Sequence, residues 1–222
     1  MTRISVSFYR NNGILLPDRW FNLLRNIQDE YISLLHNILN KVIYEDTATI
    51  KNMMSSSLII FKKLIAYLAY WTIPTIKVSS VCNELDIKKE TLYEFFDLLQ
   101  RADLINMVRK RKASIRSLKD TRILFLNPNL YYAISSELWK HTPDLGNIRE
   151  SFFVSQIEQP LYASQVTDYE LDFQGKIISF EIGGKSKSRS QIKDIENSYV
   201  FKDGISIGYE NVIPLYLAGF LY

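Results

Sequence analysis

Two acidic residues and a lysine in the last third of the chain have the types and spacing of a metal-dependent phosphate site. Asp172 lies on a predicted strand, YELDF, and Glu181 ends the next predicted strand, IISFE. Lys185 follows just beyond the pair Gly183-Gly184. Two carboxylates at adjacent strand ends can hold a divalent metal near a phosphate, and a lysine can orient the attacking water. The pattern predicts Asp172, Glu181 and Lys185 as catalytic residues, with the two acids as metal ligands.

The segments around these residues predict a mixed α/β region that would position them. A helix with inward apolar residues is expected over 146–158, followed by a short strand. The two strands that carry the acids come next, with Gly175-Lys176 as the turn between them. A helix is expected over about 188–197 and a further strand at Tyr199. Helix, three strands, helix and strand make a mixed α/β core.

The same acids also fit a structural role. Asp172 and Glu181 would then be solvent-facing strand acids paired with Lys176 or Lys185. Each such exposed pair contributes under ~1 kcal/mol to stability.

A phosphate loop is the other motif that this stretch suggests, because Gly184-Lys185-Ser186 is similar to the end of a P-loop. A P-loop has a second glycine five positions before the one that precedes Lys-Ser/Thr. Ser179 stands at that position. We therefore expect no ATP binding through a P-loop in this chain.

The composition is that of an ordinary globular protein, and 222 residues suffice for two small domains or one large one. The most apolar stretch, residues 55–74, contains Lys62 and Lys63, so we expect no transmembrane helix. No signal-peptide core opens the sequence. Cys82 is the single cysteine, which excludes a disulfide framework and a cysteine-based metal cluster. A cytoplasmic location is the expectation.

Positive charge is concentrated in the middle of the chain. Residues 51–127 carry fourteen basic and seven acidic groups, whereas residues 128–222 carry eight basic and twelve acidic groups. A polyanion would therefore meet the middle first. The same middle predicts a short helix over 78–85, a second helix over 88–101, and two strands between residues 104 and 126. This is the order of a winged helix-turn-helix, whose second helix enters the DNA major groove while the hairpin touches the backbone.

The residues predicted to contact nucleic acid lie on the second helix and the hairpin: Lys88, Lys89, Tyr93, Arg109, Lys110, Arg111 and Lys112. Seven basic groups and one acidic group between Met107 and Arg122 favour phosphate contact. Glu90, Glu94 and Asp97 on the same helix would repel phosphate. Three roles therefore stay open for this segment: DNA contact, docking onto protein within or outside the chain, and a merely solvated hairpin.

The first part of the chain predicts helices more than a site. Residues 1–14 are predicted as a strand-like lead that ends in a turn. Apolar residues at helical spacing run from Trp20 to Ile43. A long helix over 56–73 is apolar nearly all round, which is typical of a central helix.

Several segments, in this order, resemble a family of prokaryotic AAA-type ATPases: LDIKKETLYEFFDLLQRADLI, GNIRESFF, YELDF, FEIGGKSKSRSQI and IPLYLAGFLY. Members of that family carry an N-terminal P-loop ATPase, a winged helix and a C-terminal domain of the PD-(D/E)XK restriction-endonuclease-like fold. The similarity runs from about Val42 to Tyr222 and lacks the ATPase module, so ATP binding is not carried over. It implies three parts: an N-terminal helical linker region (1–54), a winged helix-turn-helix domain (55–128) and a restriction-endonuclease-like α/β domain (129–222).

The resemblance carries over the nuclease residues only in part. Asp172 matches the first strand acid, and Glu181 matches the acid of the D/E-X-K element. Gly183 stands where that element has its lysine, so Lys185 would reach the site only if the glycine pair folds back. Glu150, on the preceding helix, would supply an additional metal-ligating acid. Mg²⁺ is the one cofactor that such a site implies.

Three functions remain open at this point. The first is a DNA- or partner-binding C-terminal module of an AAA-type ATPase-like protein, with nuclease chemistry absent or vestigial. The second is a Mg²⁺-dependent DNA nuclease of the PD-(D/E)XK type. The third is a protein–protein interaction domain that binds a partner or self-associates through apolar surface around Trp20. None of the three involves a membrane, and none involves ATP bound to this chain.

Overall fold

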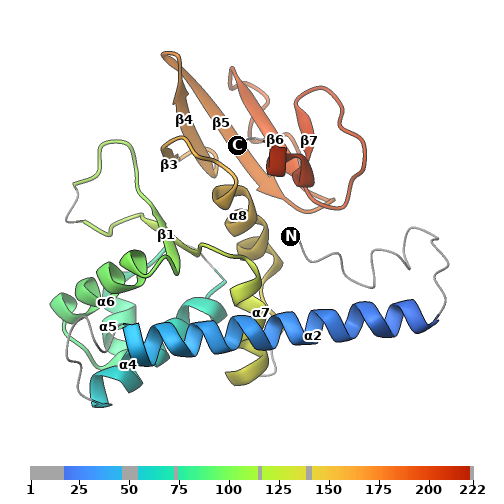
Figure 1. The fold of residues 1–222 in the computed structure, drawn as a ribbon. Helices are drawn as coiled ribbons and strands as arrows, with labels where there is room; N and C mark the ends of the chain where they lie inside the picture. The colour runs from blue at the N-terminus through green and yellow to red at the C-terminus, as the bar shows by residue number, and fades with distance from the viewer. Residues whose placement is uncertain (1–17, 47–54, 73–74, 115–116, 139–141, 221–222) are drawn as a thin grey trace.

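The computed structural model describes five stretches of the chain, shown in Figure 1: residues 18–46, 55–72, 75–114, 117–138 and 142–220. They form helices and two β-sheets, which confirms a mixed α+β class. The strand-like lead predicted over 1–14 lies outside these residues, and so does the side chain of Trp20. None of the described helices is long and apolar enough to cross a membrane.

Helices make up the first part of the described chain: α2 (Asp18–Lys41), the π-helix η1 (Val42–Asp46), α4 (Ser55–Tyr70), α5 (Val78–Leu85) and α6 (Lys89–Arg101), with α7 (Asn129–Leu138) after the hairpin. The long helix α2 runs across α7 in Figure 1. As predicted for a central helix, α4 buries Phe61, Leu64 and Ile65. Both α5 and α6 begin and end within one residue of their predicted bounds. Asp86 ends α5 in the left-handed conformation, at φ 51°.

A two-stranded antiparallel hairpin joins the helical part to the α/β part, and it consists of β1 (Ile105–Val108) and β2 (Arg122–Phe125). Alternate residues of a strand point to opposite faces. Ile123 and Phe125 accordingly pack into the helical core, whereas Leu124 packs into the core of the α/β part. Arg122 shares the face of Leu124, so the strand directs this arginine toward the α/β part.

The α/β part consists of one helix and a five-stranded sheet, which a 3₁₀ helix follows: α8 (Leu145–Ser155), β3 (Leu161–Ala163), β4 (Tyr169–Phe173), β5 (Lys176–Gly183), β6 (Ser198–Lys202), β7 (Val212–Pro214) and η2 (Leu215–Phe220). The strand order is β3-β4-β5-β6-β7. Strands β3, β4 and β5 are antiparallel, and β6 and β7 continue parallel to β5. The β4–β5 turn is Gln174-Gly175, and both residues have positive φ (52° and 77°), as a two-residue hairpin turn favours.

The two faces of this sheet have different covers. Helix α8 lies against one face (Figure 1), where Phe153 contacts Phe180 and Phe201 at ring-centroid distances of 5.2 and 4.8 Å. On the opposite face Val200 packs against Ile192. The chain between β5 and β6 therefore covers the face that α8 leaves open.

The prediction of a helix over 188–197 is wrong, because the connection between β5 and β6 consists of turns. The hydroxyl groups of Ser188 and Ser190 hydrogen bond to each other at 2.6 Å. Serine side chains that bond locally compete with helix formation. Ile192 is buried and fixes the segment to the sheet without a helix.

Candidate functional site

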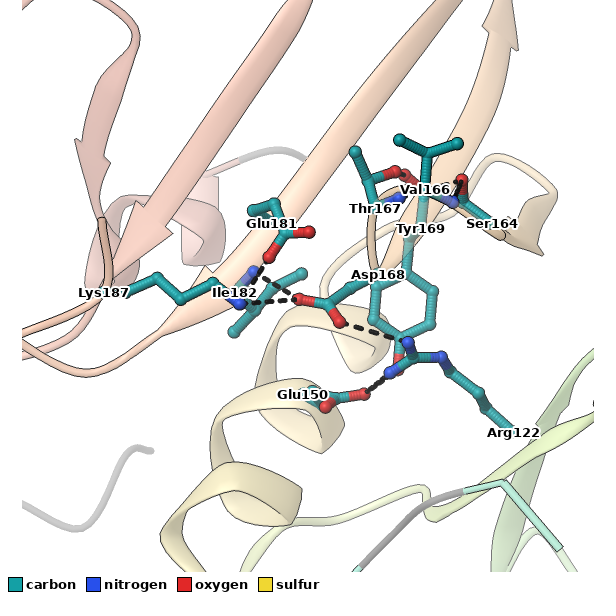
Figure 2. A network of polar contacts seen from close by, with 10 residues as sticks. All are labelled: Arg122, Glu150, Ser164, Val166, Thr167, Asp168, Tyr169, Glu181, Ile182 and Lys187. Atoms are coloured by element: carbon teal, nitrogen blue, oxygen red, sulfur yellow. Dashed lines mark hydrogen bonds and ion pairs between the residues drawn. The ribbon is translucent and has the colours of Figure 1, made fainter. Parts of the chain in front are cut away.

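A network of charged side chains joins the hairpin to the α/β part, and Arg122 is at its centre (Figure 2). Arg122 Nη1 lies 2.5 Å from Glu150 Oε2, and its Nη2 donates to Asp168 Oδ1 at 3.1 Å. The guanidinium group also lies 5.0 Å from the centre of the Tyr169 ring. Glu150 comes from α8, and Asp168 precedes β4. One arginine of the hairpin thus holds a helix and a strand of the α/β part together.

Glu150 is nearly enclosed, with 13% of its side chain exposed. Besides Arg122, it accepts a hydrogen bond from the Tyr169 hydroxyl at 2.6 Å. Burial raises the pKa of Glu150, the charge of Arg122 lowers it, and the net shift is upward. For Arg122, burial alone would lower the pKa, but Glu150 and its neighbours raise it well above the usual value. The arginine therefore stays charged, and its charge compensates two acids at once.

The second half of the network joins Asp168 to Glu181 and Lys187. Asp168 Oδ2 accepts a hydrogen bond from the Ile182 backbone N–H at 2.9 Å. Lys187 Nζ lies 2.5 Å from Glu181 Oε2 and 3.9 Å from Asp168 Oδ2. Burial raises the pKa of Glu181 to about 6 against the opposing effect of Lys187. Figure 2 shows the lysine reaching these two acids from the turn after β5.

Gly183 makes room for this lysine. A Cβ atom at Gly183 would lie 2.6–2.8 Å from Lys187 Cβ, Cγ and Cδ, which is closer than real Cβ atoms approach. The stem of Lys187 thus fills the space that a side chain at position 183 would use. The D/E-X-K resemblance implied a lysine at position 183, whereas here it is Lys187, four residues later, whose ammonium meets Glu181.

The predicted site residues are therefore only partly brought together. Glu181 and Glu150 both lie in the network, but Asp172 does not. Its carboxylate accepts from Arg111 Nη1 at 3.2 Å and from the Gly175 backbone N–H at 3.0 Å, beside the hairpin turn. That is about 13 Å along β4 from Asp168, at the usual rise per strand residue.

Lys185, the third predicted catalytic residue, is exposed and stands apart from the acids. It has no ion pair with them among the described residues, and its Cβ lies 3.5 Å from the position of a Cβ on Gly204. The glycine pair does not fold Lys185 back to the site. Lys187 takes that place.

The register of the β4–β5 hairpin identifies Asp168 once its turn is placed at Gln174-Gly175 and not at the predicted Gly175-Lys176. Strands β4 and β5 are antiparallel, so the start of β4 lies beside the end of β5. Tyr169 pairs with Phe180, which brings Asp168 next to Glu181. The prediction chose an acid near the end of β4, which lies beside the start of β5.

The residues predicted on the second helix lie at its start. Lys88 and Lys89 are exposed, and Lys89 Nζ lies 5.5 Å from the centre of the Tyr93 ring. The Tyr93 hydroxyl accepts a hydrogen bond from the Leu118 backbone N–H at 3.4 Å, which ties α6 to the hairpin. The two lysines therefore stand beside the hairpin on one surface.

The predicted basic run of the hairpin divides into paired and unpaired side chains. Lys110 Nζ contacts Asp120 Oδ2 at 2.6 Å. Arg111 lies over the Tyr162 ring at 4.7 Å and bonds the acids of β4. Arg109 Nε is enclosed without a hydrogen-bond partner among the described residues, and Lys112 is exposed. The run serves in part to dock the hairpin on the α/β part.

A divalent metal does not fit the acids as they are arranged. Asp168 gives one oxygen to Arg122 and the other to Ile182, while Glu181 is paired with Lys187. Among the residues that the structure describes, no three acidic, histidine or cysteine side chains are grouped to hold a metal ion. Two cations from the chain stand where a metal would have to bind.

Comparisons of the chain with models of protein families, with curated proteins and with solved structures find no match.

The raised pKa of Glu181 predicts a pH dependence of stability. A carboxyl whose pKa is raised from 4.5 to about 6 by folding stabilises the folded protein fully below pH 4.5, and this contribution is lost as the pH rises through about 6. Glu181→Gln has no such titration. The difference in unfolding free energy between the wild type and this variant should change by about 2 kcal/mol between these limits. Urea unfolding at a series of pH values measures it, and a constant difference would contradict the assigned pKa.

Proposed function

We propose that this chain is a DNA-binding module, in which α5, α6 and the β1–β2 hairpin act as a winged helix-turn-helix. The order of the elements and the antiparallel hairpin support this proposal. The observation that carries it is that Lys88, Lys89 and Lys112 are exposed and have no carboxylate partner in the part of the chain that the structure describes. Such lysines can replace the counterions of phosphates, which supplies most of the sequence-independent affinity for DNA.

The position of two of these lysines adds to the argument. Lys88 is the N-cap of α6, and Lys89 is its first residue. The N-terminus of a helix carries a partial positive charge that favours a phosphate. Further along α6, Asp97 is paired with Arg101 at 3.1 Å, which compensates one of the acids that would repel DNA.

The proposed interface is narrower than the predicted one. Lys110 is bound to Asp120, and Arg111 is bound to Glu170 and Asp172. Contact with DNA would require these pairs to break. We therefore assign the phosphate contacts to Lys88, Lys89 and Lys112, and we leave Lys110 and Arg111 to the docking of the hairpin, while Arg109, whose Nε is enclosed, is left out of the proposed interface.

Fluorescence anisotropy with a short DNA duplex tests the proposal. The wild type should bind with an affinity that falls steeply between roughly 50 and 200 mM salt. The double variant Lys89→Ala/Lys112→Ala should lower the slope of log affinity against log salt by about two, one unit for each phosphate contact. Lys110→Ala is the matched control and should leave the slope unchanged. Equal effects in both variants, or no binding at low salt, would overturn the proposal.

A metal-dependent nuclease is the second candidate, favoured by the grouping of Asp168, Glu181 and Lys187. This is the set of residue types that the D/E-X-K resemblance implies, with Asp168 and Lys187 in place of the residues first expected. The acids leave no room for a metal ion while Arg122 is hydrogen bonded to Asp168. DNA binding without DNA cleavage therefore remains our first proposal. Incubating the same protein–DNA samples with Mg²⁺ and running them on a gel distinguishes DNA binding from DNA cleavage. Cleavage that Asp168→Asn abolishes and Asp172→Asn retains would favour the nuclease.

The similarity to AAA-type ATPases adds a proposal about context. An ATPase, on the same polypeptide or on another, would then be a natural partner of the helical part. Association with a protein partner or with a second copy would not depend on the lysines of α6, so the salt-dependence experiment separates it from DNA binding.

A further inference from the structure

The carboxyl ends of the parallel strands β5 and β6 gather basic side chains around the pair Gly183-Gly184. The stem of Lys187 packs against Gly183. Lys202 is the residue on β6 that pairs with Gly183. Arg149, from α8, brings its guanidinium group to within 3.3 Å of the position of a Cβ on Gly184. In open α/β sheets, ligands bind outside the carboxyl ends of the strands.

Lys202 is the residue in this group that most needs an explanation. It is 7% exposed, yet no hydrogen bond or ion pair holds its ammonium group among the described residues. The nitrogen is not among the fully enclosed polar atoms, so the stem is covered and the ammonium reaches the surface. Lysines with so little exposure are ordinarily paired, because removing an ammonium from water is costly. An anion from outside the chain would provide the missing partner.

The face on which Lys202 lies follows from the strand register. Residues paired across neighbouring strands point to the same side of a sheet, and Val200 pairs with Glu181 as Lys202 pairs with Gly183. Lys202 therefore lies on the face of Glu181, opposite to α8. Arg149 approaches the glycine pair from the helix side, so cations flank the two glycines from both sides.

The charges of this group do not cancel. Lys187 is paired with Glu181, and Arg149 Nε donates to Asp203 Oδ2 at 2.9 Å. Lys202 and the exposed Lys185 have no such acid in the described part of the chain. Two uncompensated positive charges remain beside two residues without side chains.

We propose that this end of the sheet is a binding subsite for a phosphate group, held by Lys202 and Lys185. This site is not a P-loop, since turns and no helix follow the glycines. It is separate from the lysines of α6 and the hairpin, so it does not rest on the proposed function. The phosphate can belong to a nucleic acid or to a small phosphorylated molecule, because both offer the same oxygens.

Isothermal titration with inorganic phosphate tests the subsite. The wild type should bind phosphate, and Lys202→Met should weaken that binding at least about tenfold, as expected when a charge-assisted contact is lost. Methionine keeps the apolar stem, so the variant should fold. Lys176→Met, at the opposite end of β5, is the control and should bind like the wild type. Equal affinity in all three proteins, or no binding to any of them, would overturn the proposal.

A competition arm identifies the source of the phosphate. A short single-stranded DNA that displaces inorganic phosphate from the wild type would assign the subsite to nucleic acid. Binding of phosphate that the DNA does not displace would assign it to a small phosphorylated ligand. The variant Lys89→Ala/Lys112→Ala should keep phosphate binding in either case. Loss of phosphate binding in this variant would show that the subsite is not separate from the lysines of α6 and the hairpin.

Discussion

Replacing Arg122 by methionine should lower the free energy of unfolding by about 3–5 kcal/mol, the usual cost of removing one partner from a buried ion pair. Arg122 and Glu150 are 15% and 13% exposed. Without the arginine, Glu150 would face Asp168 with only the Tyr169 hydroxyl as a partner. Its pKa, already raised by burial, should rise further. The loss should therefore be larger at higher pH, where Glu150 is ionised.

Urea unfolding measures this loss, and Arg111→Met is the matched control. Arg111 also contacts two acids and a tyrosine ring, but Asp172 is 49% exposed, and solvent screens such a pair. The control should lose about 1 kcal/mol or less. Adding Glu150→Gln to Arg122→Met removes the unpaired charge and should recover part of the stability. Equal losses for the two arginines would show that Arg122 has no special role in the junction.

The role of Arg122 follows from the hairpin's place between two cores. β2 sends Ile123 and Phe125 into the helical core and Leu124 into the α/β core. The hairpin is also tied to β3, because the Ala163 backbone N–H donates to the Arg109 carbonyl at 2.9 Å. A hairpin held in this way is a structural element of both parts.

Local pattern was sufficient to predict most of the elements. α5 and α6 were found from apolar residues at helical spacing, and β4 and β5 from alternation broken by a turn at Gly175. The connection over 188–197 was missed because its polar serines and lysines fit a helix about as well as turns. Burial of Ile192 against the sheet decides between the two, and that contact is not visible in the sequence.

The candidate site was predicted less well because it depends on contacts between distant segments. Glu181 was identified from its place at the end of a strand. Asp168 follows from the observed register, in which Tyr169 pairs with Phe180, whereas the turn predicted at Gly175-Lys176 would have placed Glu170 opposite Glu181. Arg122 was counted among the basic residues of the hairpin, and nothing nearby in the sequence indicates that it meets an acid 46 positions later.

Replacing Gly183 by alanine should cost about 1–3 kcal/mol of stability, the usual effect of overpacking. The added Cβ would lie 2.6–2.8 Å from the first three carbons of the Lys187 side chain, which cannot yield without moving the backbone or losing the contact with Glu181. Glu181 would then be buried without its cation, and its pKa should rise above about 6. Urea unfolding measures the stability, and NMR titration of the glutamate carboxyl measures the pKa.

Gly184→Ala is the matched control for this substitution. Its Cβ would meet the end of the Arg149 side chain at 3.3 Å, and a flexible guanidinium can shift by a few tenths of an ångström. The control should therefore lose less stability and leave the Glu181 pKa unchanged. Gly183→Lys combined with Lys187→Gly would move the lysine to position 183 and should return the Glu181 pKa to about 6. Two results together would contradict this role of Lys187: a Glu181 pKa that the exchange does not restore, and a Gly183→Ala variant as stable as Gly184→Ala. The position of the lysine at residue 187 would then have a reason other than contact with Glu181.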